Sequence, residues 1–330
     1  MLNVGLIGVG GIGAVHAECW LRLSDTVRLA AVADTCTEKA QAYADRTGAA
    51  VYADGLELLR QEELDIVDIC VPTFLHAEYV IQAAKYVKNI MVEKPVCLTE
   101  GEAEALLQVQ KQSGARIQVG HVVRFTPAYQ YLKELVSSRK YGQVVSGHFS
   151  RISPRPVWMK GHDDLTRTGS MTLDMHIHDA DYVRYLMGAE PETIRSWGVR
   201  DENGIIQHIC TSYQYGKATL LAEASWDYPA TFPFAAEFRV RLERAAVVCD
   251  AKGVVTVYPV DGAPFAAELE PPVIMDMGIN VSDMGPYLNE IRYFLDSISD
   301  NITEGIASVA EGVASFRMVQ NEMKLLQTPE

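Results

Sequence analysis

A glycine-rich stretch near the start of the chain decides the fold, Val4-Gly5-Leu6-Ile7-Gly8-Val9-Gly10-Gly11-Ile12-Gly13. Its apolar beginning is typical of a buried strand, and the segment from Ile12 to Leu23 is typical of a helix. The glycines between them have the spacing of a dinucleotide-binding turn. Gly8 permits the tight turn, Gly10 lets a pyrophosphate approach the backbone, and Gly13 lets the helix pack closely on the strand. We therefore predict that residues 8–13 bind a dinucleotide at the helix N-terminus.

An acidic residue supports this interpretation. Asp34 follows the second predicted strand, residues 27–33, and comes 21 positions after Gly13. A carboxylate there accepts hydrogen bonds from both hydroxyls of an adenosine ribose. Its charge would repel a 2′-phosphate, so the sequence favours NAD over NADP, although Lys39 is close. The candidate cofactor-binding residues of this segment are Gly8, Gly10, Gly11, Ile12, Gly13 and Asp34.

The competing interpretation is a glycine-rich turn that binds nothing, with Asp34 capping the next helix. The order of strand, loop, helix, strand and acid argues against it.

The rest of the first 121 residues alternates strand-like and helix-like segments, the pattern of βαβ units and a parallel sheet. Thr99 precedes a helical segment and Glu102 follows three positions later, which is the signature of a capping box. The fold class is therefore α/β, with an N-terminal Rossmann dinucleotide-binding domain over residues 1–121. We predict further strands at 66–71, 90–92 and 117–119, and helices at 38–47, 76–86 and 100–113.

The pattern changes after residue 121. Glycine turns separate β-rich runs between residues 193 and 259, which is typical of an antiparallel meander. We predict a C-terminal α+β domain over residues 122–330, for substrate binding and oligomerisation. It has a large, mainly antiparallel open sheet, and the pattern leaves open whether the last helices pack back on the Rossmann domain. The predicted elements are helices at 126–138, 173–186, 287–299 and 304–326 and a strand at 143–151.

Composition limits the partners of the chain. Its 330 residues include 29 Lys and Arg against 43 Asp and Glu, a net charge of −14. This charge argues against nucleic acid or an anionic membrane as partner and favours small molecules. Six scattered cysteines without C-x-x-C spacing fit a reducing cytoplasm. The sequence lacks a basic signal-peptide region and the ~20-residue apolar run of a membrane span. An open apolar sheet face is usually covered, so we expect a homo-oligomer, a dimer or tetramer.

A charged pair and a proline end one predicted strand. Residues 89–95 read Asn-Ile-Met-Val-Glu-Lys-Pro, which places Lys94 at the carboxyl end of a sheet strand. Ligands of open α/β sheets bind beyond those ends, where a lysine can reach a cofactor and a substrate oxygen together. Taken alone, a Glu-Lys-Pro is more often a solvated turn. The neighbouring motifs favour the functional interpretation.

A second group of ionisable residues occupies positions 174–181, Asp-Met-His-Ile-His-Asp-Ala-Asp. On a helix, Asp174, His178 and Asp181 are spaced i, i+4 and i+7 and share one face. A histidine takes a hydroxyl proton near neutral pH, and a neighbouring carboxylate orients its ring. One alternative is a metal site at His176 and His178, but helical residues two apart point about 200° from each other, so we predict no metal. The other alternative is a polar helix face packed on another domain.

Taken in order, these motifs resemble the glucose-fructose oxidoreductase and inositol dehydrogenase superfamily, and the likeness extends over essentially the whole chain. Residues 8–13 are similar to its dinucleotide loop, and 71–76 to the segment along the nicotinamide ribose. Residues 93–95 are similar to its Glu-Lys-Pro tripeptide, and 120–125 to the run entering the second domain. Asp174 and His178 resemble its catalytic pair.

The resemblance implies a role for each matching residue. His178 takes the substrate hydroxyl proton while hydride leaves for the nicotinamide, and Asp174 lies beside it. Lys94 holds the substrate oxygen and stabilises developing negative charge. Arg124 and Asp181 match positions that line the sugar pocket. The resemblance further implies that Pro72, Thr73, His76, Glu93 and Lys94 contribute to the cofactor site, and that the bond before Pro95 is cis.

The chain also departs from the family pattern. Gly169-Ser170-Met171 stands where a glycine triplet often precedes the Asp, and His176 takes a position that is often small or apolar. These departures leave the substrate open. Trp158, Trp226 and Tyr228 are candidates for a sugar-stacking face, although large aromatic residues are more often core.

We therefore expect an NAD-dependent oxidoreductase that interconverts a secondary alcohol and a ketone of a sugar, cyclic polyol or glycoside. One alternative is a glycosidase that uses NAD for transient oxidation with no net redox change. Another is a regulatory protein that binds NAD without turnover. The joint presence of Lys94, Asp174 and His178 argues against the regulatory protein, since sensing requires none of them.

Overall fold

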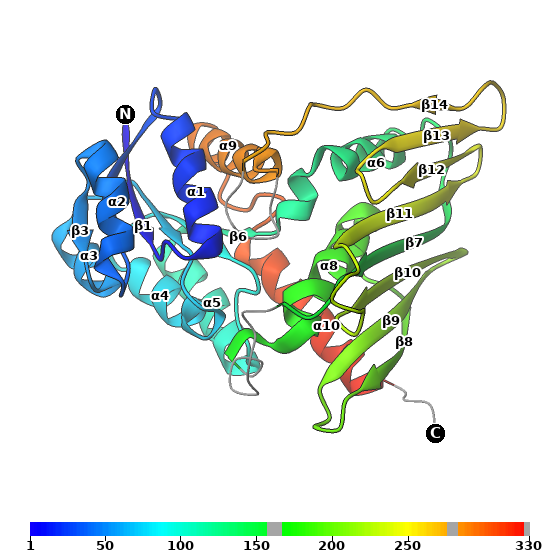
Figure 1. The fold of residues 1–330 in the computed structure, drawn as a ribbon, viewed down its shortest axis with the longest axis horizontal. Helices are drawn as coiled ribbons and strands as arrows, with labels where there is room; N and C mark the ends of the chain where they lie inside the picture. The colour runs from blue at the N-terminus through cyan, green and yellow to red at the C-terminus, as the bar shows by residue number, and fades with distance from the viewer. Residues whose placement is uncertain (157–166, 276–282, 327–330) are drawn as a thin grey trace. The chain divides into compact units, whose positions relative to one another are not determined.

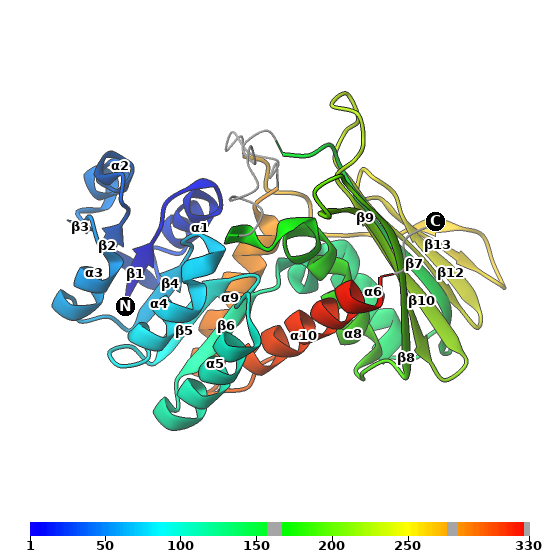
Figure 2. The same cartoon turned by 90° about the horizontal axis from the view of Figure 1, so that it is seen from below.

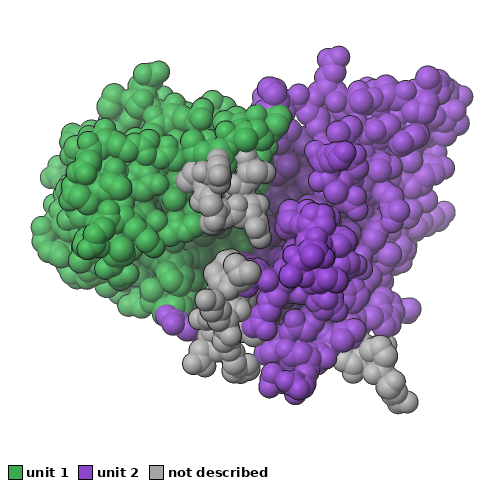
Figure 3. All heavy atoms as spheres, in the orientation of Figure 1, with its two compact units in different colours: residues 1–122, 272–314 green, residues 123–271, 315–330 purple. Residues whose placement is uncertain are grey.

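The computed structural model describes residues 1–156, 167–275 and 283–326. Contacts within the chain define two units, coloured separately in Figure 3. Unit 1 comprises Met1–Val122 and Pro272–Ala314, and unit 2 comprises Val123–Pro271 and Ser315–Glu330. This division differs from a single cut after residue 121, because the segment 272–314 joins the first unit. None of the described helices combines the length and apolarity that a membrane crossing requires.

Unit 1 contains a parallel six-stranded sheet in the order β3-β2-β1-β4-β5-β6 (Figure 1). This order reverses direction at β1, so the loops after β1 and β4 lie at a switch point where ligands of such sheets bind. Every predicted strand of the first 121 residues is present, but the short β3 and α3 were not predicted. The strands are β1 (Leu2–Ile7), β2 (Val27–Ala33), β3 (Ala50–Tyr52), β4 (Ile66–Ile69), β5 (Asn89–Glu93) and β6 (Arg116–Gly120).

Helices connect these strands and cover both sheet faces. The predicted capping box of α5 is confirmed, with Thr99 and Glu102 each bonded to the other's backbone N–H. α9, from the segment that returns to unit 1, packs against α1. The helices of unit 1 are α1 (Gly11–Arg22), α2 (Thr37–Thr47), α3 (Gly55–Gln61), α4 (His76–Ala83), α5 (Glu100–Ser113) and α9 (Gly285–Ser299).

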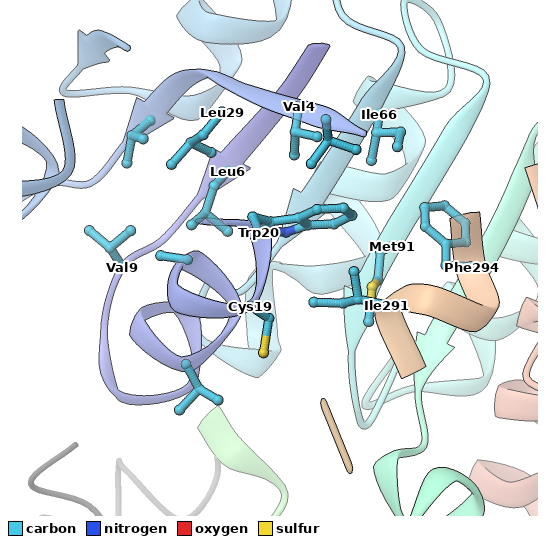
Figure 4. Packing of buried hydrophobic residues seen from close by; sticks show 14 of the residues in the cluster. Val4, Leu6, Val9, Cys19, Trp20, Leu29, Ile66, Met91, Ile291 and Phe294 are labelled. Carbon is cyan, nitrogen blue, oxygen red and sulfur yellow. The ribbon is translucent and has the colours of Figure 1, made fainter. Parts of the chain in front are cut away.

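The core of unit 1 lies between the sheet, α1 and α9 (Figure 4). Successive residues of a strand point to opposite faces. Val4 and Leu6 therefore face α1, whereas an added Cβ on Gly5 would meet Leu58 of α3 on the other face. Figure 4 shows residues of this core from α1, α9 and the sheet: Leu6, Cys19, Trp20, Met91, Ile291 and Phe294.

Unit 2 contains an eight-stranded sheet in the order β14-β13-β12-β11-β7-β10-β9-β8. Its pairs are antiparallel except β10 with β7, which are parallel. The predicted turns at Gly204, Gly216 and Gly253 all adopt a positive φ. The strands are β7 (Val144–Ile152), β8 (Thr193–Arg200), β9 (Ile206–Tyr215), β10 (Ala218–Ser225), β11 (Ala235–Leu242), β12 (Ala245–Cys249), β13 (Val255–Pro259) and β14 (Phe265–Ala266).

Helices pack on one face of this sheet (Figure 2). The rings of Tyr129 of α6 (Pro127–Ser137) and Tyr182 of α8 (Ile177–Met187) pack against Phe149 of β7. The last turns of α10 (Val309–Leu325) bond to β9. The opposite face carries exposed side chains such as Trp197 and Val199 of β8, and no described helix covers it.

The segment that carries Asp174 and His178 begins with a π-helical turn, Thr172–His176, and continues as α8. The sequence predicted a single helix over 173–186. The wider π turn was not predicted because the positions of apolar residues do not distinguish it from an α turn over so few residues. Gly188 ends α8 in the left-handed conformation.

Candidate functional site

The glycine loop joins β1 to α1 and is shaped by backbone contacts. Gly8 has a φ of 89°, a conformation that side-chain-bearing residues rarely adopt, and its N–H donates to Ala33 O at 2.7 Å. A Cβ on Gly13 would lie 2.0 Å from Gly8 O and 3.1 Å from Cys70 Cβ. Gly8 and Gly13 are therefore required for the fold of the loop itself.

Gly10 has a different environment. A Cβ added to Gly10 would meet no heavy atom within 4 Å, so glycine is not needed there for packing of the chain. The first turn of α1 contains no acidic side chain, and its backbone N–H groups carry partial positive charge that favours an anion. The open space at Gly10, beside this helix N-terminus, fits the pyrophosphate of a dinucleotide.

Asp34 lies directly after β2 and supports the loop. Its carboxylate accepts hydrogen bonds from the backbone N–H groups of Val9 and Cys36, both at 2.8 Å. Each carboxylate oxygen has further acceptor capacity, so these bonds leave room for ribose hydroxyls. The alternative in which Asp34 caps the next helix does not hold, because the N-cap residue of α2 is Cys36. The bond to Val9 was not predicted, since the spacing in sequence does not indicate which backbone donor turns toward Asp34.

His76 begins α4 and connects two strand-end segments. Its Nδ1 lies 2.7 Å from Pro95 O, and its Nε2 lies 2.8 Å from Val71 O. Burial lowers the pKa of His76, because the charged ring would lose its hydration, while the two carbonyl groups oppose that shift. The ring is buried against protein carbonyls. His76 thus links the segments that follow β4 and β5, and its contribution to the cofactor site stays a prediction.

Lys94 follows β5 at the same edge of the sheet. It is partly exposed between two buried neighbours, Glu93 and Pro95, and its backbone N–H donates to Glu93 Oε2 at 3.0 Å. The Lys94–Pro95 bond is cis, as expected. A Cβ on Gly120 of β6 would lie 2.9 Å from Glu93 Oε1. Glu93 is therefore held inside unit 1 beneath the lysine and does not extend into solvent.

A buried ionic network lies under the glycine loop. His16 of α1 is 2.8 Å from Asp68 Oδ2 through Nδ1 and 3.2 Å from Glu93 Oε1 through Nε2. Trp20 donates its indole N–H to the same Asp68 oxygen at 2.7 Å. Burial alone lowers the pKa of His16, but the interactions of the ring with Asp68 and Cys70 together outweigh burial and raise the pKa well above its ordinary value. The network joins α1 to the ends of β4 and β5 and was not predicted, because its members are far apart in sequence.

His16, Asp68 and Cys70 also lie close enough together to hold a metal ion. Burial raises the pKa of the Cys70 thiol, and the negative Asp68 raises it further. A neutral thiol and a protonated His16 bonded to Asp68 satisfy this cluster without an ion.

In unit 2, Asp174 and His178 differ from all their neighbours. Within the segment from Met171 to Val183, Asp174 and His178 are partly exposed and all the remaining residues are buried. They are four positions apart, which places them on one side of the π turn and the first turn of α8. A carboxylate and an imidazole thus come together on the accessible side of an otherwise buried segment.

His176 takes a different direction from His178. It is fully buried, and its Nε2 lies 2.5 Å from Glu322 Oε2 on α10. The alternative of a metal site shared by His176 and His178 is therefore wrong, because the first ring bonds to α10 and the second belongs to the accessible side.

Arg124 and Asp181 lie together but buried. Arg124 donates from Nε and Nη2 to the two carboxylate oxygens of Asp181, at 2.8 and 2.6 Å, and Ser315 donates to Oδ1 at 2.6 Å. Both side chains are at most 1% exposed. Of the three residues on the predicted face, only Asp174 and His178 are partly exposed, because Asp181 is buried in its ion pair with Arg124. The predicted substrate contact of Arg124 and Asp181 stays a prediction that this pairing does not favour.

The aromatic candidates have separate environments. Trp226 is a core residue, 2% exposed and packed with Met175 and Ile209, as favoured from the sequence. Tyr228 contacts Phe232 in a tilted arrangement, with a ring-centroid distance of 4.5 Å. Trp158 lies outside the described residues.

Comparison with known proteins identifies the family. Residues 2–121 match the model of an oxidoreductase family with an NAD-binding Rossmann fold, and residues 129–248 match the GFO/IDH/MocA C-terminal domain. The chain belongs to the GFO/IDH/MocA family. Residues 2–121 are thus an NAD-binding Rossmann domain, and the sequence-based recognition of the family is confirmed.

The chain is similar to several proteins that are named as dehydrogenases. A myo-inositol 2-dehydrogenase of Thermotoga maritima is 32% identical over 194 residues, 58% of this chain and 57% of that protein. An inositol 2-dehydrogenase of Rhizobium meliloti is 27% identical, covering 98% of both chains. The match thus spans little more than half of the Thermotoga protein. A UDP-N-acetylglucosamine 3-dehydrogenase from Acidithiobacillus ferrooxidans has the same fold, with a TM-score of 0.80 at 22% identity over 98% of this chain and 97% of the other.

Proposed function

We propose that this protein is an NAD-dependent oxidoreductase that interconverts a secondary alcohol and a ketone on a sugar or a cyclic polyol. The observation that carries the proposal is the position of Asp174 and His178, four residues apart and the two partly exposed residues of the segment 171–183. Family membership and the inositol dehydrogenase names of relatives support the substrate class.

The open space at Gly10 and the N-terminus of α1 suit the pyrophosphate of NAD. The Asp34 carboxylate accepts hydrogen bonds from the ribose hydroxyls while it keeps the hydrogen bond from the backbone N–H of Val9. When bound, NAD supplies the hydride acceptor. The negative charge of Asp34 disfavours binding of NADP, because it repels the 2′-phosphate.

The chain's own residues orient the substrate and move its proton. Lys94 holds the substrate oxygen as a fixed cation and stabilises charge that develops there. His178 takes the hydroxyl proton at a ring nitrogen, and the Asp174 carboxylate orients the ring and stabilises its charged form. In the reverse direction His178 returns the proton to the carbonyl oxygen.

The test is NADH formation on mixing the protein and NAD with a panel of inositols, hexoses and their glycosides. We expect fluorescence from at least one polyol or sugar. His178→Ala should lower kcat by about 10²- to 10⁴-fold, the usual range for a general base, with NAD affinity kept. Lys94→Met should lower kcat by about 10²- to 10³-fold, the usual loss when a group that stabilises developing charge is removed. Turnover within a few-fold of the parent in either variant would refute the assigned role, and release of a free sugar without NADH would identify the glycosidase alternative.

We also propose that the protein is a cytoplasmic homo-oligomer that uses the uncovered face of the unit 2 sheet. Trp197 and Val199 on β8 are 44% and 47% exposed on that face, and apolar sheet faces are usually covered. Sedimentation should show a dimer or tetramer that Trp197→Asp weakens, with the exposed Lys324→Ala as control. A monomeric parent protein would refute this proposal.

A further inference from the structure

The two sides of the segment 171–178 are sharply different. Thr172 and His176 are fully buried, whereas Asp174 and His178 are partly exposed. On a helical turn, residues four apart share a side and residues two apart lie on nearly opposite sides. The direction of Asp174 and His178 is therefore set by whatever holds Thr172 and His176 from behind.

The end of α10 holds both buried residues. Thr172 Oγ1 lies 3.2 Å from Met323 Sδ, and His176 Nε2 lies 2.5 Å from Glu322 Oε2. Consecutive residues of α10 thus contact the first and the last residue of the π turn.

Glu322 is itself fixed by the sheet. Its Oε1 accepts the phenol O–H of Tyr213 at 2.8 Å, and its Oε2 accepts the hydroxyl of Thr211 at 3.0 Å. Ser196 lies 3.0 Å from that hydroxyl. The carboxylate is completely buried, and a buried carboxylate requires several donors in good geometry. Three donors from two elements leave its oxygens little freedom to move.

The pairing also determines the tautomer of His176. Its Nδ1 is buried and has no hydrogen-bond partner among the described residues. An N–H there would be an unsatisfied buried donor, so the neutral ring carries its proton on Nε2 and donates it to Glu322. This bond directs the His176 ring toward α10, two positions before His178.

We propose that Glu322 is a positioning residue for the proton-transfer pair: through His176 it holds the π turn so that Asp174 and His178 point to the accessible side. The inference rests on the proposed function of these two residues. Glu322 touches neither substrate nor cofactor in this role, and it acts only through the buried turn.

The test compares Glu322→Ala, the milder Glu322→Gln and His176→Leu with Asn321→Ala, which alters an exposed neighbour on the same helix. A displacement of about 1 Å in a catalytic group lowers turnover by about 10²-fold. We expect Glu322→Ala and His176→Leu to lower kcat by about 10- to 100-fold and to leave the Kd for NAD unchanged. Glu322→Gln keeps an acceptor oxygen, so it should lose less. Asn321→Ala should match the parent.

A second readout does not depend on turnover. In protein labelled with ¹³C-histidine, the His178 signal, assigned by its loss in His178→Ala, is titrated against pH. Glu322→Gln and His176→Leu should move its chemical shift and its titration midpoint, whereas Asn321→Ala should not. A folded Glu322→Gln and a folded His176→Leu that both leave kcat and the His178 titration unchanged would overturn the proposal. If His178→Ala keeps full turnover while the titration moves in those variants, the proposed function fails but the positioning of His178 stands.

Discussion

In the glycine loop, Gly13→Ala and Gly10→Ala are similar substitutions that we expect to have different effects. Gly13→Ala should strongly destabilise the protein without NAD, whereas Gly10→Ala should cost less stability and weaken NAD binding. The difference arises because a Cβ at residue 13 would lie 2.0 Å from Gly8 O, and a Cβ at residue 10 would meet no atom within 4 Å.

The magnitude for Gly13→Ala follows from this contact. The obstructing atom is a backbone oxygen of Gly8, a residue held by its bond to Ala33 and by its positive φ, so it cannot move as a flexible side chain would. Overpacking costs about 1 to 3 kcal/mol, and the upper end applies here. The higher helix propensity of alanine returns about 0.5 to 1 kcal/mol. The net loss of about 2 kcal/mol lowers the melting temperature by about 4 to 8 °C.

Gly10→Ala is the matched control. Gly10 is the N-cap residue of α1, where alanine is less favourable than glycine by about 1 kcal/mol, so the melting temperature should fall by about 2 to 4 °C, less than in Gly13→Ala. The new methyl group occupies the space assigned to the pyrophosphate, and titration calorimetry should show NAD affinity at least about 10-fold weaker. Gly13→Ala with an unchanged melting temperature would refute the packing argument. Unaltered NAD affinity in Gly10→Ala would refute the placement of the pyrophosphate.

Three further predictions concern single side chains. Asp34→Asn keeps one acceptor oxygen for Val9 and removes the charge, so the KM for NAD should rise and discrimination against NADP should shrink; equal NADP discrimination in steady-state assays would contradict the ribose contact. The raised pKa of His16 means that its bond to Asp68 stabilises fully below about pH 6.5 and that this contribution is lost as pH rises through the folded-state pKa. Urea midpoints of His16→Gln should therefore fall less steeply than those of the parent on the alkaline side, and parallel curves would disprove it. Hydrogen bonds from His148 and His208 hold the pKa of Glu223 well below its usual range, and the same Glu223 raises the pKa of His208. Both interactions contribute fully to protein stability between about pH 4.3 and 6.5. The contribution of Glu223 is lost below this window as it protonates, and that of His208 is lost above it as the ring deprotonates. Glu223→Gln should therefore flatten the stability maximum in this window, and a maximum that persists in the urea unfolding curves of the variant would rule this out.

Much of the fold could be predicted from local patterns. The strand-loop-helix order around residues 4–23 and the capping box at Thr99 depend on neighbours within a few positions, where sequence spacing and structure are directly related. The order of motifs was enough to recognise the family. The pattern could not reveal that β7 inserts between β10 and β11, because that pairing joins residues about 70 to 100 positions apart, and β strands of similar composition can pair in several orders.

For the candidate site too, the sequence predicted the residue types and the structure added their burial and partners. Lys94, Asp174 and His178 were identified as residue types at suitable positions, and the structure adds that the last two are the accessible members of a buried segment. The pattern of i, i+4 and i+7 grouped Asp181 with them on one helix face, but it did not show that Asp181 is buried. Its partner Arg124 is 57 positions away, so the spacing within one helix gave no sign that this carboxylate was already paired.

The sequence by itself determined the glycine loop, the acid after the second strand and the residue types that proton transfer needs. All of these rest on short-range stereochemistry: a positive φ, a helix N-terminus, or side chains one turn apart. Only the tertiary structure decided which polar residues are buried and with whom they pair. His16 with Asp68, Arg124 with Asp181 and His176 with Glu322 join distant segments. Removing a charge from water is tolerated only where a partner meets it, and that partner comes from the packing of the whole chain.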